Sequence, residues 1–335
     1  MENADQGPGF IFQSFAAYQR TFALKAAIEV GLFGAIGANG ATVAEIARRC
    51  AASERGVRIL ADFLVVAGFL TKEGGRYGLG AAAAMFLDPA SPACIASAIA
   101  FVASAPIVEA FGALTASVRS GRSVVGERAH EPDHPMWVEF ARAMAPIAGM
   151  TAEVMAARLD ADGGRYGKVL DIAAGHGLFG ITLARHDPAA RIVALDWPNV
   201  LAVAKENARA AGVADRFETL PGSALEVDFG SGYDTVLLTN FLHHFDVAAC
   251  EGILKKVHRA LAPGGRALTV EFVPDETRVV PPEAGAFALV MLAMTPAGDA
   301  YTFAEYERMF RNAGFARSEL HQLAPTPQQL IVSRR

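Results

Sequence analysis

A glycine-rich segment between a predicted strand and a predicted helix limits the folds open to this chain. Residues 168–172 (KVLDI) form a short apolar run, and Gly175, Gly177 and Gly180 follow it with the spacing G-x-G-x-x-G. In α/β proteins such a turn connects a strand to a helix and lets the backbone approach a bound ligand closely. The segment therefore predicts a ligand site at the end of this strand.

The residues around this turn predict a parallel α/β sheet. Predicted strands alternate with helical segments such as 200–211, and the further strands are expected at 191–196, 216–220, 234–239 and 266–272. Strands that alternate with helices are typical of a parallel sheet. Two more strands are expected near the end of the chain, at 318–322 and 329–333.

The first hundred residues predict a separate, mainly helical unit. Apolar residues recur at helical spacing over 11–38, and Thr42 with Glu45 forms a capping box. A second helix is expected over 54–69, and residues 70–79 (LTKEGGRYGL) predict a β-hairpin with a Gly-Gly turn. Helix, helix and hairpin in this order indicate a winged-helix arrangement.

Residues 81–160 are rich in alanine and predicted to be helical, with a loop between 121 and 135. We therefore divide the chain into a winged-helix-type domain, a helical linker or cap, and an α/β domain that binds the ligand. These three parts are 1–105, 106–160 and 161–335.

Composition argues against several classes of protein. A chain with 52% hydrophobic and 19% charged residues is not disordered, and a net charge of -5 is atypical of a nucleic-acid binder. Cys50, Cys94 and Cys250 lack the spacing of metal ligands and suit a reducing cytoplasm. The acidic residues 1–5 are unlike a signal peptide, and the most apolar stretch, 94–108, is too short to span a bilayer. We expect a cytoplasmic protein without a metal site or a membrane partner.

Two acidic residues indicate the chemistry of the ligand. Asp171 ends the strand before the turn, where a carboxylate repels a pyrophosphate and favours a cationic group. Asp196 ends the next strand, 19 residues after Gly177, and an acid there accepts hydrogen bonds from ribose hydroxyls. S-adenosylmethionine has a ribose and cationic groups but no phosphate. The residues therefore predict this cofactor.

These residues resemble the class I methyltransferase pattern D-x-G-x-G-x-G, with Ala173 in place of the first glycine. The whole chain is similar to the O-methyltransferases with an N-terminal winged-helix dimerisation domain, which include plant phenolic, hydroxyindole and bacterial natural-product enzymes. The resemblance implies a Rossmann-like seven-stranded sheet and S-adenosylmethionine as cofactor. It also implies a homodimer formed through the N-terminal domain and a small aromatic or apolar hydroxylated acceptor.

The segment after the fourth strand carries the predicted catalytic base. The family's Leu-His-Asp-Trp pattern, with a cysteine seven residues after the histidine, matches residues 242–245 (LHHF) and Cys250. His243 occupies the position of the base, and His244 replaces the aspartate. A protonated phenol, with a pKa of about 10, is a poor nucleophile, and an imidazole with a pKa of about 6.5 can accept its proton.

The resemblance also implies partners for this base. Glu271 lies 28 residues beyond His243, at the spacing of the family's orienting glutamate. The family's second glutamate matches Ala300, and Asp299, one residue earlier, is a stand-in. His243 and His244 could instead be core or helix-start residues. A metal site that includes Asp246 is disfavoured, because adjacent residues on a helix diverge by about 100°.

The remaining site residues are assigned from the same resemblance. The cofactor-binding residues are Asp171, Ala173, Gly175, Gly177, Asp196, Trp197, Gly222, Ser223, Ala224, Thr239 and Asn240, and the acceptor-pocket residues are Phe140, Met144, His244, Met291 and Met294. A pocket lined by Phe and Met favours a flat apolar acceptor. Simple packing is the alternative for Trp197 and for the Phe and Met residues.

Four other functions compete with this interpretation. Transfer to carbon or nitrogen needs less base and would suit the absence of the second glutamate. A methyltransferase fold could also carry another activity or none. G-x-G-x-x-G alone fits an NAD oxidoreductase, but Asp171 argues against one. A DNA-binding regulator would read DNA with the 54–69 helix, which carries Arg55 and Arg58 but is otherwise largely apolar, so we expect it to be buried.

Overall fold

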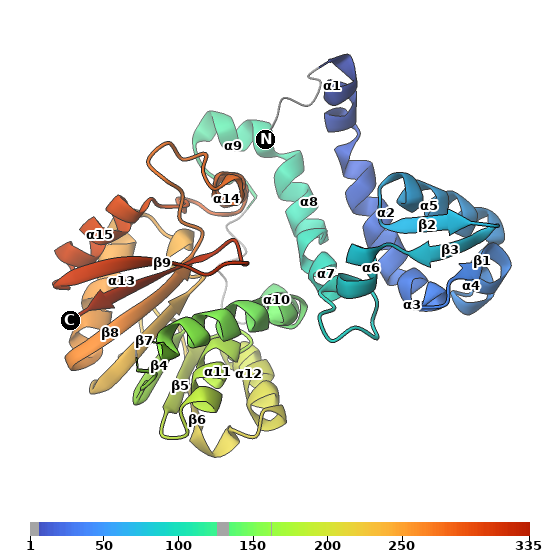
Figure 1. Ribbon diagram of the computed structural model, residues 1–335. Coiled ribbons are helices and arrows are strands. Elements are labelled where there is room, and N and C mark those ends of the chain that lie inside the picture. The colour runs from blue at the N-terminus through green and yellow to red at the C-terminus, as the bar shows by residue number, and fades with distance from the viewer. Residues whose placement is uncertain (1–6, 126–133, 162) are drawn as a thin grey trace. The chain divides into compact units, whose positions relative to one another are not determined.

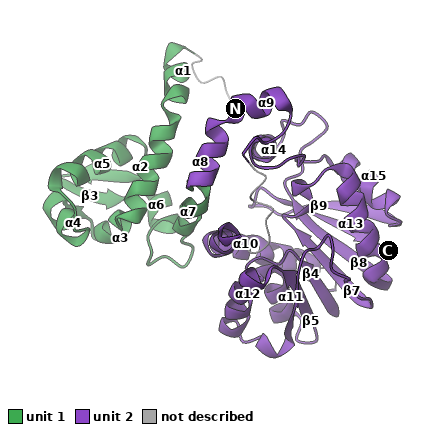
Figure 2. Cartoon of the chain, turned by 180° about the vertical axis from the view of Figure 1, so that it is seen from behind, with its two compact units in different colours: residues 1–104 green, residues 105–335 purple. Residues whose placement is uncertain are grey.

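The computed structural model describes residues 7–125, 134–161 and 163–335 (Figure 1). Contacts within the chain divide it into two compact units, Met1–Ser104 and Ala105–Arg335 (Figure 2). The loop predicted over 121–135 falls partly on residues 126–133, which lie outside the described residues.

The first unit packs short helices around a three-stranded antiparallel sheet of order β1-β3-β2. Its helices are α1 (Pro8–Phe15), α2 (Ala17–Glu29), α3 (Leu32–Ile36), α4 (Val43–Arg49), α5 (Glu54–Val66), α6 (Ala81–Phe86) and α7 (Ile99–Val102), with a 3-10 turn, η1 (Ala96–Ala98). Its strands are β1 (Ala41–Thr42), β2 (Leu70–Glu73) and β3 (Arg76–Leu79). Phe33, Ile46, Leu64 and Tyr77 are buried at its centre.

The predicted helix-helix-hairpin order is confirmed in this unit. Thr42 and Glu45 form both hydrogen bonds of the capping box at the start of α4, and β2 pairs with β3 in the predicted hairpin. The prediction of one helix over 11–38 is wrong, because the chain breaks at Ala16 and again at Gly31, whose φ of +72° ends α2. α5 ends at Val66, before Gly68, which has a φ of +81°.

The second unit contains a seven-stranded sheet of order β6-β5-β4-β7-β8-β10-β9. The strands are β4 (Lys168–Ile172), β5 (Arg191–Asp196), β6 (Phe217–Pro221), β7 (Tyr233–Thr239), β8 (Leu261–Glu271), β9 (Arg317–Gln322) and β10 (Gln329–Arg334). The first five of these strands run parallel, whereas β10 runs antiparallel to β8 and β9. The Rossmann-like seven-stranded sheet is therefore confirmed.

Helices cover both faces of this sheet (Figure 1). The helical elements are α8 (Ala105–Gly112), α9 (Leu114–Ser120), α10 (Pro135–Asp160), α11 (Leu178–His186), α12 (Pro198–Ala210), α13 (Val247–Ala260), α14 (Pro282–Met294) and α15 (Phe303–Asn312), with 3-10 turns η3 (Ala214–Arg216) and η4 (Leu242–His244). Along β7, Leu237 packs with α10, α11 and α12, and Leu238 packs with α13 and α15. This alternation explains why the middle of β7, residues 236–238, is apolar on both faces.

The sheet topology determines where a ligand can bind. The chain builds β4, β5 and β6 outward in one direction and then returns to place β7 on the other side of β4. A crevice forms at such a switch point, beyond the carboxyl ends of the two neighbouring strands. The glycine-rich turn after β4 and the His-His segment after β7 both lie at this edge. Within the described residues, no helix is both long and apolar enough to cross a membrane.

Candidate active site

The turn from β4 to α11 leaves space for a ligand at one of its glycines. Ala173, Gly175 and Gly177 all adopt left-handed backbone conformations, with φ of +53°, +57° and +73°. A methyl group added at Gly177 would lie 3.0 Å from Cβ of Ala204, so α12 packs closely there. At Gly175 the nearest described atom would be the Ala173 carbonyl oxygen, at 3.9 Å. A ligand can therefore approach the backbone at Gly175.

Asp171 presents a buried carboxylate oxygen that lacks a partner. Its Oδ2 accepts a hydrogen bond of 3.2 Å from the Gly180 backbone N–H, whereas Oδ1 is buried and has no hydrogen-bond partner among the described residues. Burial raises the pKa of Asp171 to about 7, and the nearby carboxylate of Asp196 acts in the same direction. An unsatisfied, desolvated acid of this kind fits a ligand that brings a positive charge.

Asp196 lies at the end of β5, beside the same turn. Its Oδ2 accepts from the Gly175 N–H at 2.8 Å, and its Oδ1 accepts from the Trp197 N–H at 2.7 Å. Burial raises the pKa of Asp196 to about 6. Each carboxylate oxygen retains a free lone pair for a hydroxyl donor. The carboxylates of Asp171 and Asp196 and the open backbone at Gly175 thus fit the ammonium and ribose groups of S-adenosylmethionine.

Sequence reasoning did not single out His176, which lies between two glycines of the turn. Its Nδ1 accepts a hydrogen bond of 3.1 Å from the Leu178 N–H, and the Asn207 side chain donates to its carbonyl oxygen at 2.8 Å. Burial lowers the pKa of His176 to about 4. This imidazole is therefore neutral at physiological pH and does not repel a cationic ligand.

The other predicted cofactor residues follow β5, β6 and β7 at the same edge. Gly222 has a φ of +136° and donates its N–H to the Asp196 carbonyl at 2.9 Å, and Ser223 and Ala224 continue this loop. Thr239 is buried, and Asn240 adopts a left-handed φ of +53° and accepts a hydrogen bond from the Gln328 amide. Trp197 packs in a cluster with Trp137, Val138 and Val200, which is the packing alternative considered from the sequence.

The structure brings His243 and Glu271 together in a buried pair. Nδ1 of His243 lies 2.5 Å from Oε2 of Glu271, and both side chains are at most 5% exposed. The other oxygen, Oε1, accepts hydrogen bonds of 3.0 Å from the backbone N–H groups of Phe241 and Leu242. A carboxylate that accepts on both oxygens makes Nδ1 the donor, so Nε2 carries the free lone pair. Among the described residues, none forms a hydrogen bond with Nε2.

Aromatic rings surround this imidazole. The ring of Phe287 meets His243 edge-on with centroids 4.7 Å apart, and it stacks on Phe272 at 4.2 Å. The ring centroid of His244 lies 4.3 Å from that of His243 and 5.9 Å from that of Trp137. The ring of Trp137 in turn meets the ring of Phe140, with centroids 6.0 Å apart. His243 therefore lies beside a mainly apolar cluster of aromatic rings, most of which meet edge-on.

Of the predicted acceptor residues, Phe140 and His244 belong to this aromatic cluster, and Met144 follows Phe140 by one turn of α10. Met291 and Met294 lie on α14, one and nearly two turns after Phe287. Phe287, Trp137 and Phe272 were missed from the sequence. The spacing i, i+4, i+7 of Phe287, Met291 and Met294 on one helix face is the signal that could have identified Phe287.

Asp299 does not contact the imidazole with its carboxylate. Its Oδ2 pairs with Arg278 at 3.3 Å, its Oδ1 accepts from the Ala300 N–H at 2.8 Å, and burial raises its pKa. The backbone N–H of Asp299, however, donates to the His243 carbonyl at 3.0 Å. Asp246 caps α13 by accepting from the Ala249 N–H at 2.8 Å. In the described ranges, no group of His, Cys, Asp and Glu has the arrangement of a metal site.

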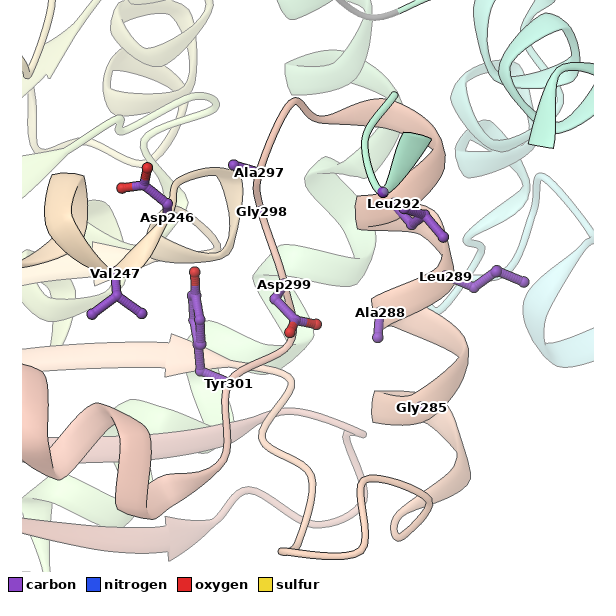
Figure 3. Close-up of a pocket in the computed structure, with 11 residues that line it drawn as sticks. Asp246, Val247, Gly285, Ala288, Leu289, Leu292, Ala297, Gly298, Asp299 and Tyr301 are labelled. Carbon is purple, nitrogen blue, oxygen red and sulfur yellow. The ribbon is translucent and has the colours of Figure 1, made fainter. Parts of the chain in front are cut away.

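A cavity of about 600 Å³ borders Asp299 (Figure 3). The side chains of Asp246, Ala288, Leu289, Leu292, Asp299 and Tyr301 line it. Neither His243 nor any predicted acceptor-pocket residue is among its lining residues. On α14, Leu289 lies about 160° around the helix from both Phe287 and Met291, whereas Ala288 is only about 60° from Met291. The cavity therefore lies along the flank of α14, next to the 297–301 segment.

Comparisons with known proteins agree with this geometry. The chain matches the model of the O-methyltransferase domain over residues 111–316 and that of the O-methyltransferase dimerisation domain over residues 12–89. It is 32% identical over 303 residues to 3-hydroxy-5-methyl-1-naphthoate 3-O-methyltransferase of Streptomyces sahachiroi, covering 88% of this chain and 86% of that protein.

Two solved structures have the same fold over nearly the whole chain. A protein of Nostoc punctiforme, assigned as an O-methyltransferase, is 49% identical with a TM-score of 0.94, covering 99% of this chain and 100% of that one. Human N-acetylserotonin methyltransferase, solved with S-adenosylmethionine, has a TM-score of 0.85 at 21% identity, with 100% and 99% covered. This chain belongs to the O-methyltransferase family, and its matches indicate transfer of a methyl group from S-adenosylmethionine to a hydroxyl.

Proposed function

We propose that this enzyme methylates a hydroxyl group of a small, flat aromatic compound and that His243 is its general base. The observation that carries the proposal is the buried pair of His243 and Glu271, which leaves Nε2 as the acceptor beside the ring of Phe287. The similarity to an enzyme named for a hydroxynaphthoate acceptor supports the same acceptor class.

The side chains of the site assist the transfer in two ways. Nε2 of His243 accepts the proton of the acceptor hydroxyl as the oxygen forms its new bond to carbon, and Glu271 stabilises the imidazolium that results. The rings of Phe287, His244 and Trp137 hold a flat acceptor in one orientation and exclude water. The cofactor, when bound, supplies an electrophilic methyl group on a sulfonium. Asp171 of β4 and Asp196 of β5, which lie beside the glycine-rich turn, would hold its ammonium and ribose groups.

A screen of matched acceptors tests this proposal. The purified enzyme is incubated with S-adenosylmethionine and 1-naphthol, with 1-naphthylamine and naphthalene as analogues that offer nitrogen or carbon instead of oxygen, and with substituted phenols and hydroxynaphthoates. We expect mass spectrometry to show the gain of one methyl group on hydroxyl compounds alone, and NMR to place that methyl group on oxygen, because the product methylated on ring carbon has the same mass. Methylation of the amine or of ring carbon without methylation of any hydroxyl would contradict the proposal.

We further propose that the chain forms a homodimer through its first unit. Five aromatic residues of α1 and α2 expose between 43% and 72% of their surface: Phe10, Phe12, Phe15, Tyr18 and Phe22. No described residue of α1 is buried. A short helix this apolar needs a covering surface to be stable in water. The match of residues 12–89 to a dimerisation domain supports a second copy of the chain as that surface.

The Phe12→Asp/Phe15→Asp double variant is expected to be monomeric. A homodimer carries each substitution twice, so four buried phenylalanines are lost at about 1.5–3 kcal/mol each, which weakens the dimer by about four to nine orders of magnitude. Sedimentation velocity measures the result, and Val66→Asp, at an exposed apolar position of α5, is the matched control. A double variant that sediments like the wild-type dimer would show that α1 is not in the interface.

Two broader assignments complete the proposal. We place dimerisation in the first unit, Met1–Ser104, and cofactor and acceptor binding in the second, Ala105–Arg335. The three cysteines are free thiols, which suits the reducing cytoplasm that we propose as the location of the enzyme.

A further inference from the structure

The segment of residues 298–301 contacts the backbone of residues 243–245, which carry His243. The backbone N–H of Asp299 donates to the His243 carbonyl at 3.0 Å, and the Tyr301 hydroxyl donates to the Phe245 carbonyl at 2.6 Å. Directly before Asp299, the chain passes so close to His243 that a methyl group added at Gly298 would overlap the His243 carbonyl oxygen. The position of the base therefore depends on this segment as well as on Glu271.

One side chain holds the 298–301 segment from outside. Nη1 of Arg278 donates to the Ala300 carbonyl at 3.2 Å and lies 3.3 Å from Oδ2 of Asp299. Nη2 of the same guanidinium pairs with Glu305 at 2.6 Å. Glu305 also closes the capping box of α15 by accepting from the Thr302 N–H at 2.8 Å. A single planar cation thus connects the segment to the first turn of the next helix.

Arg278 is itself fixed by the turn that follows β8. It adopts a left-handed φ of +63°, which is unusual for a residue other than glycine, and donates its N–H to the Asp275 carbonyl at 2.9 Å. The Asp275 N–H donates to the Val280 carbonyl at 2.6 Å, which closes the turn. β8 ends at Glu271, so one strand and its turn supply both the partner of the imidazole and the support of its backbone.

We propose that Arg278 is a positioning residue for His243, which it serves by holding the 298–301 segment against the His243 backbone. The proposal rests on the base role of His243 proposed above. By resemblance, the family's second supporting glutamate falls on Ala300, and the buried alanine methyl group has no polar atom to offer the imidazole. In this chain the 298–301 segment supports His243 through contacts with the His243 backbone. The Arg278 guanidinium holds that segment in place, and a second carboxylate is not needed.

Hydrogen exchange of the ligand-free protein tests the positioning directly. In Arg278→Ala we expect the amides of residues 241–247 to exchange about tenfold faster than in the wild type, because charge-assisted hydrogen bonds that hold the 298–301 segment are lost. Arg311→Ala, which removes an exposed i,i+4 pair with Glu307 on α15, is the matched control and should leave these amides unchanged. Equal exchange of residues 241–247 in Arg278→Ala and the control overturns the proposal.

A conservative variant covers the case in which Arg278→Ala is destabilised throughout. Loss of global stability would raise exchange in buried strands such as β5 as well, and Arg278→Lys is then decisive. Lysine keeps the charge but cannot form the same set of parallel hydrogen bonds, so we expect a smaller rise confined to residues 241–247. Two results together would also overturn the proposal. Arg278→Lys would show wild-type exchange at residues 241–247, and the faster exchange of Arg278→Ala would be no greater at residues 241–247 than in the rest of the protein.

Kinetics then separate this inference from the proposed function. With the acceptor that turns over fastest in the screen, Arg278→Ala should lower kcat about tenfold and leave the KM for S-adenosylmethionine unchanged, as expected of a displaced catalytic group. If His243→Ala has wild-type kcat, the base assignment fails, and the exchange result alone decides whether Arg278 positions the turn. If His243→Ala is impaired and Arg278→Ala is not, Arg278 has no positioning role.

Discussion

Replacement of His243 by alanine is expected to lower kcat for methylation of an aromatic hydroxyl by about a hundredfold or more. The imidazole is the group placed to accept the hydroxyl proton, and Glu271 holds it with Nε2 free. Without a base, the acceptor must react from its small ionised fraction. Because His243 has no part in the proposed contacts to the cofactor, the dissociation constant of S-adenosylhomocysteine should be unchanged in calorimetric titration.

Two further variants make this result specific. Glu271→Gln should also lower kcat strongly. The glutamine amide has a single oxygen, and this oxygen cannot accept both from Nδ1 of His243 and from the backbone N–H groups of Phe241 and Leu242. His321→Ala, on the edge strand β9, is the control histidine and should have wild-type kcat. An unchanged rate in His243→Ala would remove this histidine from the mechanism.

Replacement of Asp171 by asparagine is expected to weaken binding of S-adenosylhomocysteine about thirtyfold to a hundredfold at pH 8, which corresponds to about 2–3 kcal/mol for a charge-assisted contact. Asparagine has the shape of aspartate and can still accept from the Gly180 N–H. It lacks the negative charge that Oδ1 presents to a cationic group. Titration calorimetry of the two proteins, with Asp215→Asn at an exposed position as control, measures the difference.

The pH dependence gives a second readout with a defined sign. Burial raises the pKa of Asp171 to about 7 in the free enzyme, so below that pH a bound cation must displace a proton. Wild-type affinity should therefore fall about tenfold for each pH unit below 7, and the affinity of Asp171→Asn should vary less. The pKa of Asp196, raised to about 6, adds to the wild-type trend only below that value.

The free energy of unfolding of the ligand-free enzyme should fall as the pH rises, whereas the affinity for S-adenosylhomocysteine should rise. An acid whose folded-state pKa is raised contributes stability that is complete below its unfolded pKa, near 4, and is lost as the pH rises through its folded pKa. For Asp171 this loss occurs between about pH 4 and the value of about 7, so the ligand-free Asp171→Asn protein should have a higher Tm than the wild type at pH 8. A lower Tm together with weaker binding would indicate disrupted packing instead.

Much of the sheet could be predicted from the sequence, because buried parallel strands are continuous apolar runs between clear turn signals. β4 and β5 begin and end at the predicted residues. β8 begins five residues earlier than predicted, because Leu261 pairs with Tyr233 of β7 and a register shift then carries the strand past Pro263 and Gly264 to Arg266, which pairs with Thr235. Proline and glycine ordinarily interrupt a strand. The break at Ala16 has no glycine or proline to indicate it.

The candidate site could be predicted where its chemistry follows from spacing along the chain. The distance from His243 to Glu271 is set by one helix and one strand, so the pair was identifiable by resemblance and is present in the structure. Phe287 and Arg278 act through contacts between elements that are distant in the sequence, and their residue types alone do not indicate a role. Asp299 had the expected residue type, but its carboxylate turns to Arg278, a partner that becomes visible only in three dimensions.

The cavity beside α14 has a consequence for the range of compounds that such an enzyme can accept. Protein interiors are normally close-packed, so a helix that borders a binding pocket cannot yield without displacing its neighbours. Here α14 carries Phe287 and Met291, and its residues Ala288, Leu289 and Leu292 border an open cavity of about 600 Å³. Gly298 and Asp299 line the same cavity and contact the His243 backbone. We therefore expect substitutions at Leu289 and Leu292 to change the size of acceptor that fits beside Phe287, and larger shifts of α14 to disturb the segment that supports His243.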